Sequence, residues 1–127
     1  MPAIFIVHSL PFVTVKLRSN NKELVLSRVL IDTGLASTVF RTDDLRTLDV
    51  YIDGSDQLRF MRGIGGYEAV VEKGIESIEI DGLIATPFII EVGALDYGFQ
   101  IDGILGSNFL LQVGAQINFK TLTLEKA

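Results

Sequence analysis

The segment Val29-Leu30-Ile31-Asp32-Thr33-Gly34-Leu35-Ala36-Ser37-Thr38-Val39-Phe40 decides how the chain folds and what it does. An apolar run leads into a single carboxylate, Asp32, and Gly34 then allows the backbone to turn sharply. The inner end of a buried strand is an unfavourable place for an acid unless the acid is hydrogen-bonded or used in chemistry. Thr33, Gly34 and Ser37 supply possible donors. The pattern favours a functional carboxylate, although Asp and Gly also close many ordinary turns.

Size and composition predict one globular domain, spanning residues 1–127, with a core of its own. The net charge is -5 and basic residues form no cluster, which argues against binding to nucleic acid or to an anionic membrane. The chain has no cysteine and one histidine, so we expect neither a metal site nor a cofactor. No apolar run is long enough to cross a membrane, and the start lacks a basic signal-peptide region. We therefore expect a cytoplasmic protein.

The first third of the chain has the pattern of a β-meander. Apolar residues alternate in Phe12–Leu17, and a second β-like segment, Ala3–His8, precedes it, with Pro11 expected to break between the two. The polar segment Ser19–Lys22 predicts a turn, and Glu23–Ile31 is then the strand that delivers Asp32.

Further along, two short helices and several more strands are expected. Thr42–Leu48 reads as a helix capped by Thr42, and Ile101–Gln112 as a buried strand end followed by a Ser/Asn cap and an apolar helix. Asp81-Gly82 predicts a hairpin between Ile75–Ile80 and Leu83–Ile90, and Glu91–Gln100 reads as a loop. Eight or nine strands with one or two short helices place the chain in the all-β class.

A second hairpin is predicted over Leu58–Val71, and its tip contains Gly63, Ile64, Gly65 and Gly66. Three glycines in four residues permit positive φ angles and keep the tip thin. An apolar Ile64 between glycines suggests a tip that closes over something, whereas the simpler interpretation is a flexible turn. A nucleotide-binding loop is poorly supported, because no helix pattern with Lys and Ser or Thr follows.

Taken in order, these motifs resemble the retropepsins, the single-domain aspartic proteases. The resemblance rests on Leu30–Gly34, Gly63–Gly66, Ile104–Leu110 and Gly114–Phe119, and it covers about residues 5–119. It implies a closed acid-protease β barrel with a flap hairpin. Asp32 matches the catalytic aspartate, Thr33 the residue whose hydroxyl ties two active-site loops together across a dimer, and Gly34 the glycine that approaches the carboxylate and the substrate.

The resemblance also assigns the flap and part of the cleft. Residues Gly63 to Gly66 match the flap tip, with Ile64 at the position that touches the partner flap, while Ile104 and Leu105 match the apolar pair that supports the active-site loop and lines the cleft. Two positions depart from the family pattern. Leu35 stands where members commonly carry a small residue, and it makes a bulkier cleft wall; Ala36 stands where retroviral members carry an Asp.

Aspartic-protease chemistry requires two carboxylates that share one proton. The chain has a single Asp-Thr-Gly, and Asp102 is not followed by Thr-Gly, so it reads as a strand-end residue. Helix capping is a sufficient explanation for Asp43 and Asp44. The second catalytic acid should therefore be Asp32 of another copy, in a homodimer that cleaves extended peptides. The alternative is a non-catalytic, dimeric peptide- or partner-binding module on the same fold, and a domain cut from a larger precursor also stays open.

Overall fold

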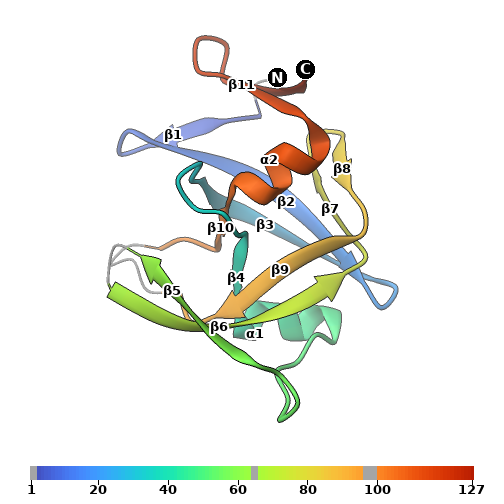
Figure 1. Cartoon of the computed structure of the whole chain (residues 1–127). Coiled ribbons are helices and arrows are strands. Elements are labelled where there is room, and N and C mark those ends of the chain that lie inside the picture. Colours follow the sequence, from blue (N-terminus) through green and yellow to red (C-terminus); the bar gives the residue numbers. More distant parts are fainter. Residues whose placement is uncertain (1–2, 64–65, 96–99) are drawn as a thin grey trace.

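The computed structural model describes residues 3–63, 66–95 and 100–127, and most of them lie in strands (Figure 1). No helix within these ranges is both long and apolar enough to cross a membrane. The described elements are β1 (Phe5–Val7), β2 (Leu10–Ser19), β3 (Lys22–Ile31), β4 (Val39–Arg41), α1 (Thr42–Leu45), the 3-10 helix η1 (Arg46–Leu48), β5 (Leu58–Gly63), β6 (Gly66–Ile75), β7 (Ser77–Ile80), β8 (Leu83–Ala85), β9 (Phe88–Gly93), β10 (Gly103–Leu105), α2 (Ser107–Val113), β11 (Ala115–Asn118) and β12 (Thr123–Lys126).

Ten of these strands form one sheet, along the path β5-β6-β9-β4-β10-β3-β2-β7-β8, with β1 paired to β2. Most neighbours are antiparallel, but β10 runs parallel to β3 and β4 runs parallel to β9. The all-β prediction is thus correct at the level of a mostly β fold. Among the described strands no ladder joins β5 to β8, so the closed barrel stays a prediction.

Tight turns set the pairing of the first strands. The turn between β1 and β2 is His8-Ser9 and the turn between β2 and β3 is Asn20-Asn21; all four residues have positive φ angles. Two-residue turns of this kind match the twist of an antiparallel hairpin. The expected break at Pro11 is wrong, because Pro11 lies within β2 opposite Ile6 of the three-residue strand β1. The predicted Asp81-Gly82 hairpin is confirmed as the β7–β8 turn.

The two faces of the sheet pack into separate apolar clusters. The main core contains Phe40, Val71, Ile90 and Val92, together with Leu45 and Leu48 of the α1–η1 segment. Alternate residues point to opposite faces of a strand, so the residues next to them face the other way. On that second face one cluster is built on Phe12, Leu30, Ile101 and Ile104, and another on Val39 and Val70.

Several predicted boundaries are corrected by the structure. The single strand expected over Leu83–Ile90 is two strands, because Thr86-Pro87 separates β8 from β9. The loop expected to begin at Glu91 is also wrong at its start, since β9 continues to Gly93. Thr42 is the first residue of α1, not its cap, and Arg41 takes the N-cap position without a side-chain hydrogen bond.

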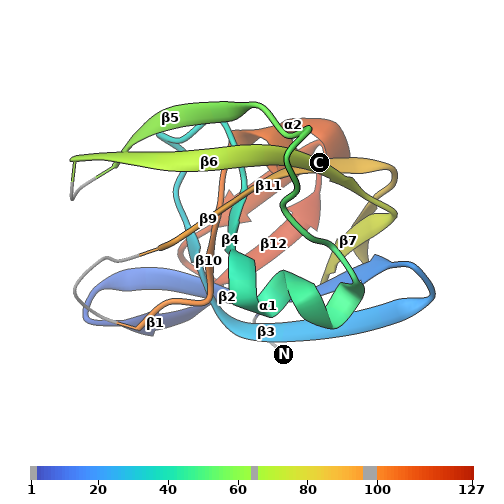
Figure 2. The same cartoon turned by 90° about the horizontal axis from the view of Figure 1, so that it is seen from below.

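The first described residues contact the C-terminal β11–β12 hairpin. The Ile4 N–H donates to the Leu122 carbonyl at 3.0 Å, which joins the first residues to the turn between β11 and β12. These two strands form a small antiparallel sheet of their own. Seen from below, α1 lies between β3 and β4 (Figure 2).

Candidate active site

Asp32 is the first residue after β3, and backbone hydrogen bonds hold it from both sides. Its N–H donates to the Leu105 carbonyl of β10 at 2.9 Å, and its own carbonyl accepts the Leu35 N–H at 3.2 Å. The carboxylate oxygen Oδ1 accepts the Gly34 N–H at 3.0 Å. Asp32 itself is half-buried, whereas Thr33 and Gly34 are exposed. The strand therefore presents an oriented carboxylate to solvent in a turn with fixed geometry.

Gly34 lies in close contact with the Asp32 carboxylate. A Cβ atom at Gly34 would lie 3.3 Å from Oδ1 of Asp32, so any larger residue would press on the carboxylate that its own N–H holds. This explains the Asp-x-Gly spacing in physical terms. The glycine amide binds the acid, and the absence of a side chain keeps the approach to it open.

The start of α2 docks onto the loop that follows Asp32. The Ser107 N–H donates to the Leu35 carbonyl at 2.8 Å, and the Asn108 N–H donates to the Ala36 carbonyl at 3.2 Å. The Ser107 hydroxyl donates to the Thr33 carbonyl at 2.7 Å. The expected Ser/Asn cap is wrong, since Gly106 is the N-cap and no side chain caps the helix. The first N–H groups of α2, which no helix can pair internally, bind the Asp32 loop instead.

A buried threonine links the loop to both β10 and α2. Thr38 is fully buried, and its hydroxyl donates to the side-chain oxygen of Asn108 at 2.6 Å while accepting the Gly106 N–H at 3.1 Å. The Asn108 amide group in turn donates to the Ile89 carbonyl of β9 at 3.2 Å. A Cβ at Gly106 would overlap the carbonyl groups of Leu35 and Ser37. This crossing of two chain segments leaves room only for glycine.

The predicted cleft-wall residues fall in two environments. Ile104 is buried in the cluster with Phe12 and Leu30, and the half-buried Leu35 packs against that cluster as well as against Val39 and Val70. Leu105 belongs to the main core, and it reaches the Asp32 loop through its carbonyl. Leu35 and Ile104 thus share a face beside Asp32, while Leu105 supports the loop from behind.

The predicted flap corresponds to the β5–β6 hairpin, in which Gly63 pairs with Gly66. Ile64 and Gly65 lie outside the described residues. Both views show this hairpin and the β1–β2 hairpin projecting toward the same side of the molecule (Figures 1 and 2). Val70 of β6 packs with Val39 and Leu35, so this hairpin borders the face that carries the second-face clusters.

The other candidate acids already have partners. Asp102 accepts the Arg28 N–H at 3.1 Å and lies 3.3 Å from the Arg41 guanidinium, which also pairs with Asp44 at 2.9 Å. Asp43 lies 3.7 Å from Arg46. In the described parts of the chain no group of three or more His, Cys, Asp or Glu residues could hold a metal ion. Asp32, by contrast, makes no ion pair within the described ranges.

Sequence reasoning missed the residues that fix the loop from the side. The Ser37 hydroxyl donates to Glu91 of β9 at 2.5 Å, and Glu91 is 5% exposed. The sequence pattern predicts a loop from Glu91 onward, so it gives no indication that this side chain is buried. Thr38 and Asn108 lie 70 residues apart in sequence, and the pairing of β10 with both β3 and β4 brings them together.

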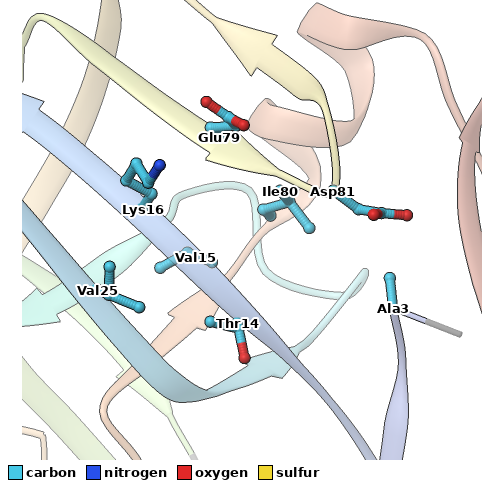
Figure 3. Close-up of a pocket in the computed structure, with 8 residues that line it drawn as sticks. All are labelled: Ala3, Thr14, Val15, Lys16, Val25, Glu79, Ile80 and Asp81. Carbon is cyan, nitrogen blue, oxygen red and sulfur yellow. The ribbon is translucent and has the colours of Figure 1, made fainter. Parts of the chain in front are cut away.

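Two hollows of the surface lie away from Asp32 or at its flank. One of about 340 Å³ is lined by residues of β2, β3 and β7, including Lys16, Val25 and Glu79 (Figure 3). None of its lining residues belongs to the Asp32 loop, β10 or α2. A second, of about 250 Å³, lies beneath the β1–β2 hairpin between Phe12 and Arg28. Neither contains Asp32, so the carboxylate and not a cavity defines the candidate site.

A family model described as aspartyl protease matches residues 13–109. This range includes the Asp32 loop, the β5–β6 hairpin and the start of α2. The chain belongs to this retropepsin-like aspartyl protease family. No curated protein matches the chain in a direct sequence comparison. The family match supports a protease-type function, and the geometry above shows how this member builds its Asp-Thr-Gly loop.

Proposed function

We propose that the protein is an aspartic endopeptidase that hydrolyses peptide bonds at a site shared by two copies of the chain. The observation that carries this proposal is the Asp32 carboxylate, which is oriented by the Gly34 N–H at 3.0 Å in an exposed turn of a family member. Catalytic Asp32, with Thr33 and Gly34 as its loop, is the assignment that this geometry supports.

The mechanism needs a pair of carboxylates. Two Asp32 side chains about 3 Å apart cannot both ionise, so they would hold one proton between them. The ionised member takes a proton from water, and the protonated member donates its proton to the scissile carbonyl oxygen. Water adds to the carbonyl carbon, and the tetrahedral species then breaks the C–N bond as a proton passes to the leaving amine. The dyad ends with one proton, as it began.

A homodimer supplies the second acid most simply. In a two-fold symmetric interface, a residue close to the axis meets its own twin. Asp32 is half-exposed and Thr33 is exposed in the single chain, so both are available to a partner. The Thr33 carbonyl accepts the Ser107 hydroxyl of its own chain, and the hydroxyl of the exposed Thr33 would bind the opposite loop.

The substrate would be an extended peptide held between the two loops and the flaps. Gly63, Ile64, Gly65 and Gly66 would form the flap tip of each copy. Leu35 and Ile104 would line the cleft, with Leu105 supporting the loop, and the barrel would close as in the retropepsins. The support for this arrangement is that Val70 of β6 packs in the same second-face cluster as Val39 and Leu35.

A cleavage assay on a peptide library tests the proposal, with Asp32→Asn as the inactive variant. We expect the wild type to cleave with a bell-shaped pH profile that peaks on the acid side of neutral, because only the singly protonated pair is active. Asp32→Asn should retain the fold and lose cleavage. Cleavage that persists in Asp32→Asn, with contaminating protease excluded, would refute the assignment.

The non-catalytic binding module is the second candidate, and the specific observation behind it is the pair of family departures, Leu35 and Ala36. It predicts no cleavage at any pH, with peptide binding little changed by Asp32→Asn. Sedimentation at micromolar concentration is expected to show two chains under either function, whereas a strict monomer with full activity would exclude the shared site.

A further inference from the structure

Glu91 is the one charged residue that is buried in the described parts of the chain, with 5% of its surface exposed. Acids are rarely buried unless they are paired or used. Glu91 lies in the middle of β9, in the sheet and not in a surface loop. No part of the catalytic proposal above uses this side chain, so its burial calls for a separate explanation.

The register of β9 places Glu91 on the same side of the sheet as the cleft wall. Its neighbours in sequence, Ile90 and Val92, point into the main core, so Glu91 points to the opposite face. Across the sheet it stands opposite Val39 of β4 and Glu72 of β6. Val39 packs in the cluster that also receives Leu35 from the Asp32 loop.

The carboxylate of Glu91 lies directly behind the Asp32 loop. Its Oε1 accepts the Ser37 hydroxyl at 2.5 Å, and its N–H donates to the Thr38 carbonyl at 2.8 Å. Ser37 is half-buried, so the carboxylate lies one hydroxyl group beneath the accessible surface of the loop. An ionised carboxylate can accept about four hydrogen bonds. Within the described ranges Ser37 is the side chain that donates to it, and further acceptor capacity remains.

The charges around Glu91 favour a cation. Glu72, its cross-strand neighbour, is a second acid, and the Arg59 guanidinium pairs with Glu72 at 2.7 Å. The structure gives Arg59 no contact with Glu91. Two acids against one paired base leave this part of the face acidic, in a protein of net charge -5.

We propose that Glu91 is a specificity-determining residue that binds a basic side chain, Lys or Arg, of the peptide substrate close to the scissile bond. The inference rests on the proposed endopeptidase function and names its substrate class. A Lys or Arg side chain has a long apolar stem that suits the half-buried Leu35, and a cationic end that can replace or join the Ser37 hydroxyl at the carboxylate.

The test compares matched peptides that carry Lys or its uncharged isostere norleucine at each position near the scissile bond. We expect kcat/KM to favour Lys at one position, and Glu91→Gln to lower it for the Lys peptide by about tenfold to hundredfold, the factor that corresponds to one charged hydrogen bond. The ratio of kcat/KM for the Lys peptide to kcat/KM for the norleucine peptide should fall by this factor, whatever change is common to both peptides. Gln retains an oxygen that accepts the Ser37 hydroxyl, so the loop contact is preserved and only the charge is lost.

Glu72→Gln is the matched control, because it removes an acid from the same face without touching Ser37. It should lower the Lys preference far less than Glu91→Gln does, because Glu72 adds to the acidity of this face but has no contact with Ser37. Thermal unfolding of each variant checks that it folds. If Glu91→Gln does not fold, Glu91→Met serves as a second variant. Equal kcat/KM for Lys and norleucine peptides in the wild type would overturn the inference while leaving the endopeptidase function intact.

A binding arm separates the two proposals. The same peptides are titrated against Asp32→Asn by fluorescence anisotropy, with and without Glu91→Gln. If the Lys peptide binds more tightly than the norleucine peptide and Glu91→Gln abolishes this difference, the role of Glu91 is supported even when the wild type cleaves neither peptide. Absence of cleavage would then remove only the endopeptidase function. Absence of any Lys preference in both binding and cleavage overturns the inference.

Discussion

Thr38→Val is the sharpest test of how the Asp32 loop is held. The side chain is fully buried, and its hydroxyl accepts the Gly106 N–H at 3.1 Å and donates to Asn108 at 2.6 Å. Valine has almost the same shape, so the substitution removes both hydrogen bonds without opening a cavity. The loss of stability therefore reports the polar network, reduced by the gain from burying the valine methyl group.

The expected magnitude follows from the two groups left without a partner. A buried N–H that loses its acceptor destabilises the fold by about 1–3 kcal/mol, and Gly106 is buried. Asn108 is half-buried, so water recovers part of its loss. The additional apolar burial of the valine methyl offsets about 0.8 kcal/mol. The net loss should be about 2–3 kcal/mol, which for a chain of 127 residues lowers Tm by about 8–10 °C.

Urea unfolding at a fixed protein concentration measures this loss, since dimerisation would make the midpoint depend on concentration. Thr14→Val is the matched control, because Thr14 lies exposed in β2 and should change stability by less than about 0.5 kcal/mol. Thr38→Ser, which keeps the hydroxyl, should be destabilised less than Thr38→Val. If Thr38→Val is as stable as the Thr14 control, the network does not hold the loop as described.

Three further predictions follow from single contacts. Gly106→Ala should destabilise the fold by about 3 kcal/mol, because its Cβ would meet the Leu35 carbonyl at 2.7 Å. Gly74→Ala is the control and should not destabilise the fold, because the space around Gly74 is open. Urea unfolding of the two variants measures the difference. The hydrogen-bonded ion pair with Lys73, at 2.8 Å, lowers the pKa of Asp56. The stability that this pair contributes is therefore present above about pH 4 and is lost as the pH falls below that value. Lys73→Met should flatten the pH dependence of the free energy of unfolding in that acid range alone. Thr33→Ala should weaken the proposed dimer by about 1 kcal/mol per lost hydrogen bond, and an unchanged dissociation constant in sedimentation would exclude the bridging role of its hydroxyl.

The sequence predicted those parts of the structure that local chemistry controls. Asn20-Asn21 and Asp81-Gly82 favour positive φ angles, so both hairpins could be placed from the turn residues. Asp32, Thr33 and Gly34 were found because carboxylate and amide donor lie two residues apart in the chain. Pro11 misled the prediction, since the turn that matters is made by the two residues before Leu10 and not by the proline.

The rest of the site depends on contacts between distant segments. Ser107 and Asn108 were expected to cap their own helix, but β10 delivers them to the Asp32 loop, where the carbonyl groups of Thr33, Leu35 and Ala36 accept their donors. Glu91 gave no signal, because an isolated acid in an apolar run reads as the end of a strand. Its burial becomes evident only when β9 is paired with both β4 and β6.

The two departures from the family pattern can now be weighed against this framework. Leu35 is half-buried against two apolar clusters, and its N–H and carbonyl still bind Asp32 and Ser107. Ala36 is exposed, and its carbonyl still accepts the Asn108 N–H. Neither substitution removes a backbone contact that orients the Asp32 carboxylate, so their effect falls on what the cleft binds and not on how the acid is held. If the proposed endopeptidase function holds, an acid absent at Ala36 and an acid present at Glu91 point the same way, toward altered substrate choice with the backbone contacts of the Asp32 loop intact.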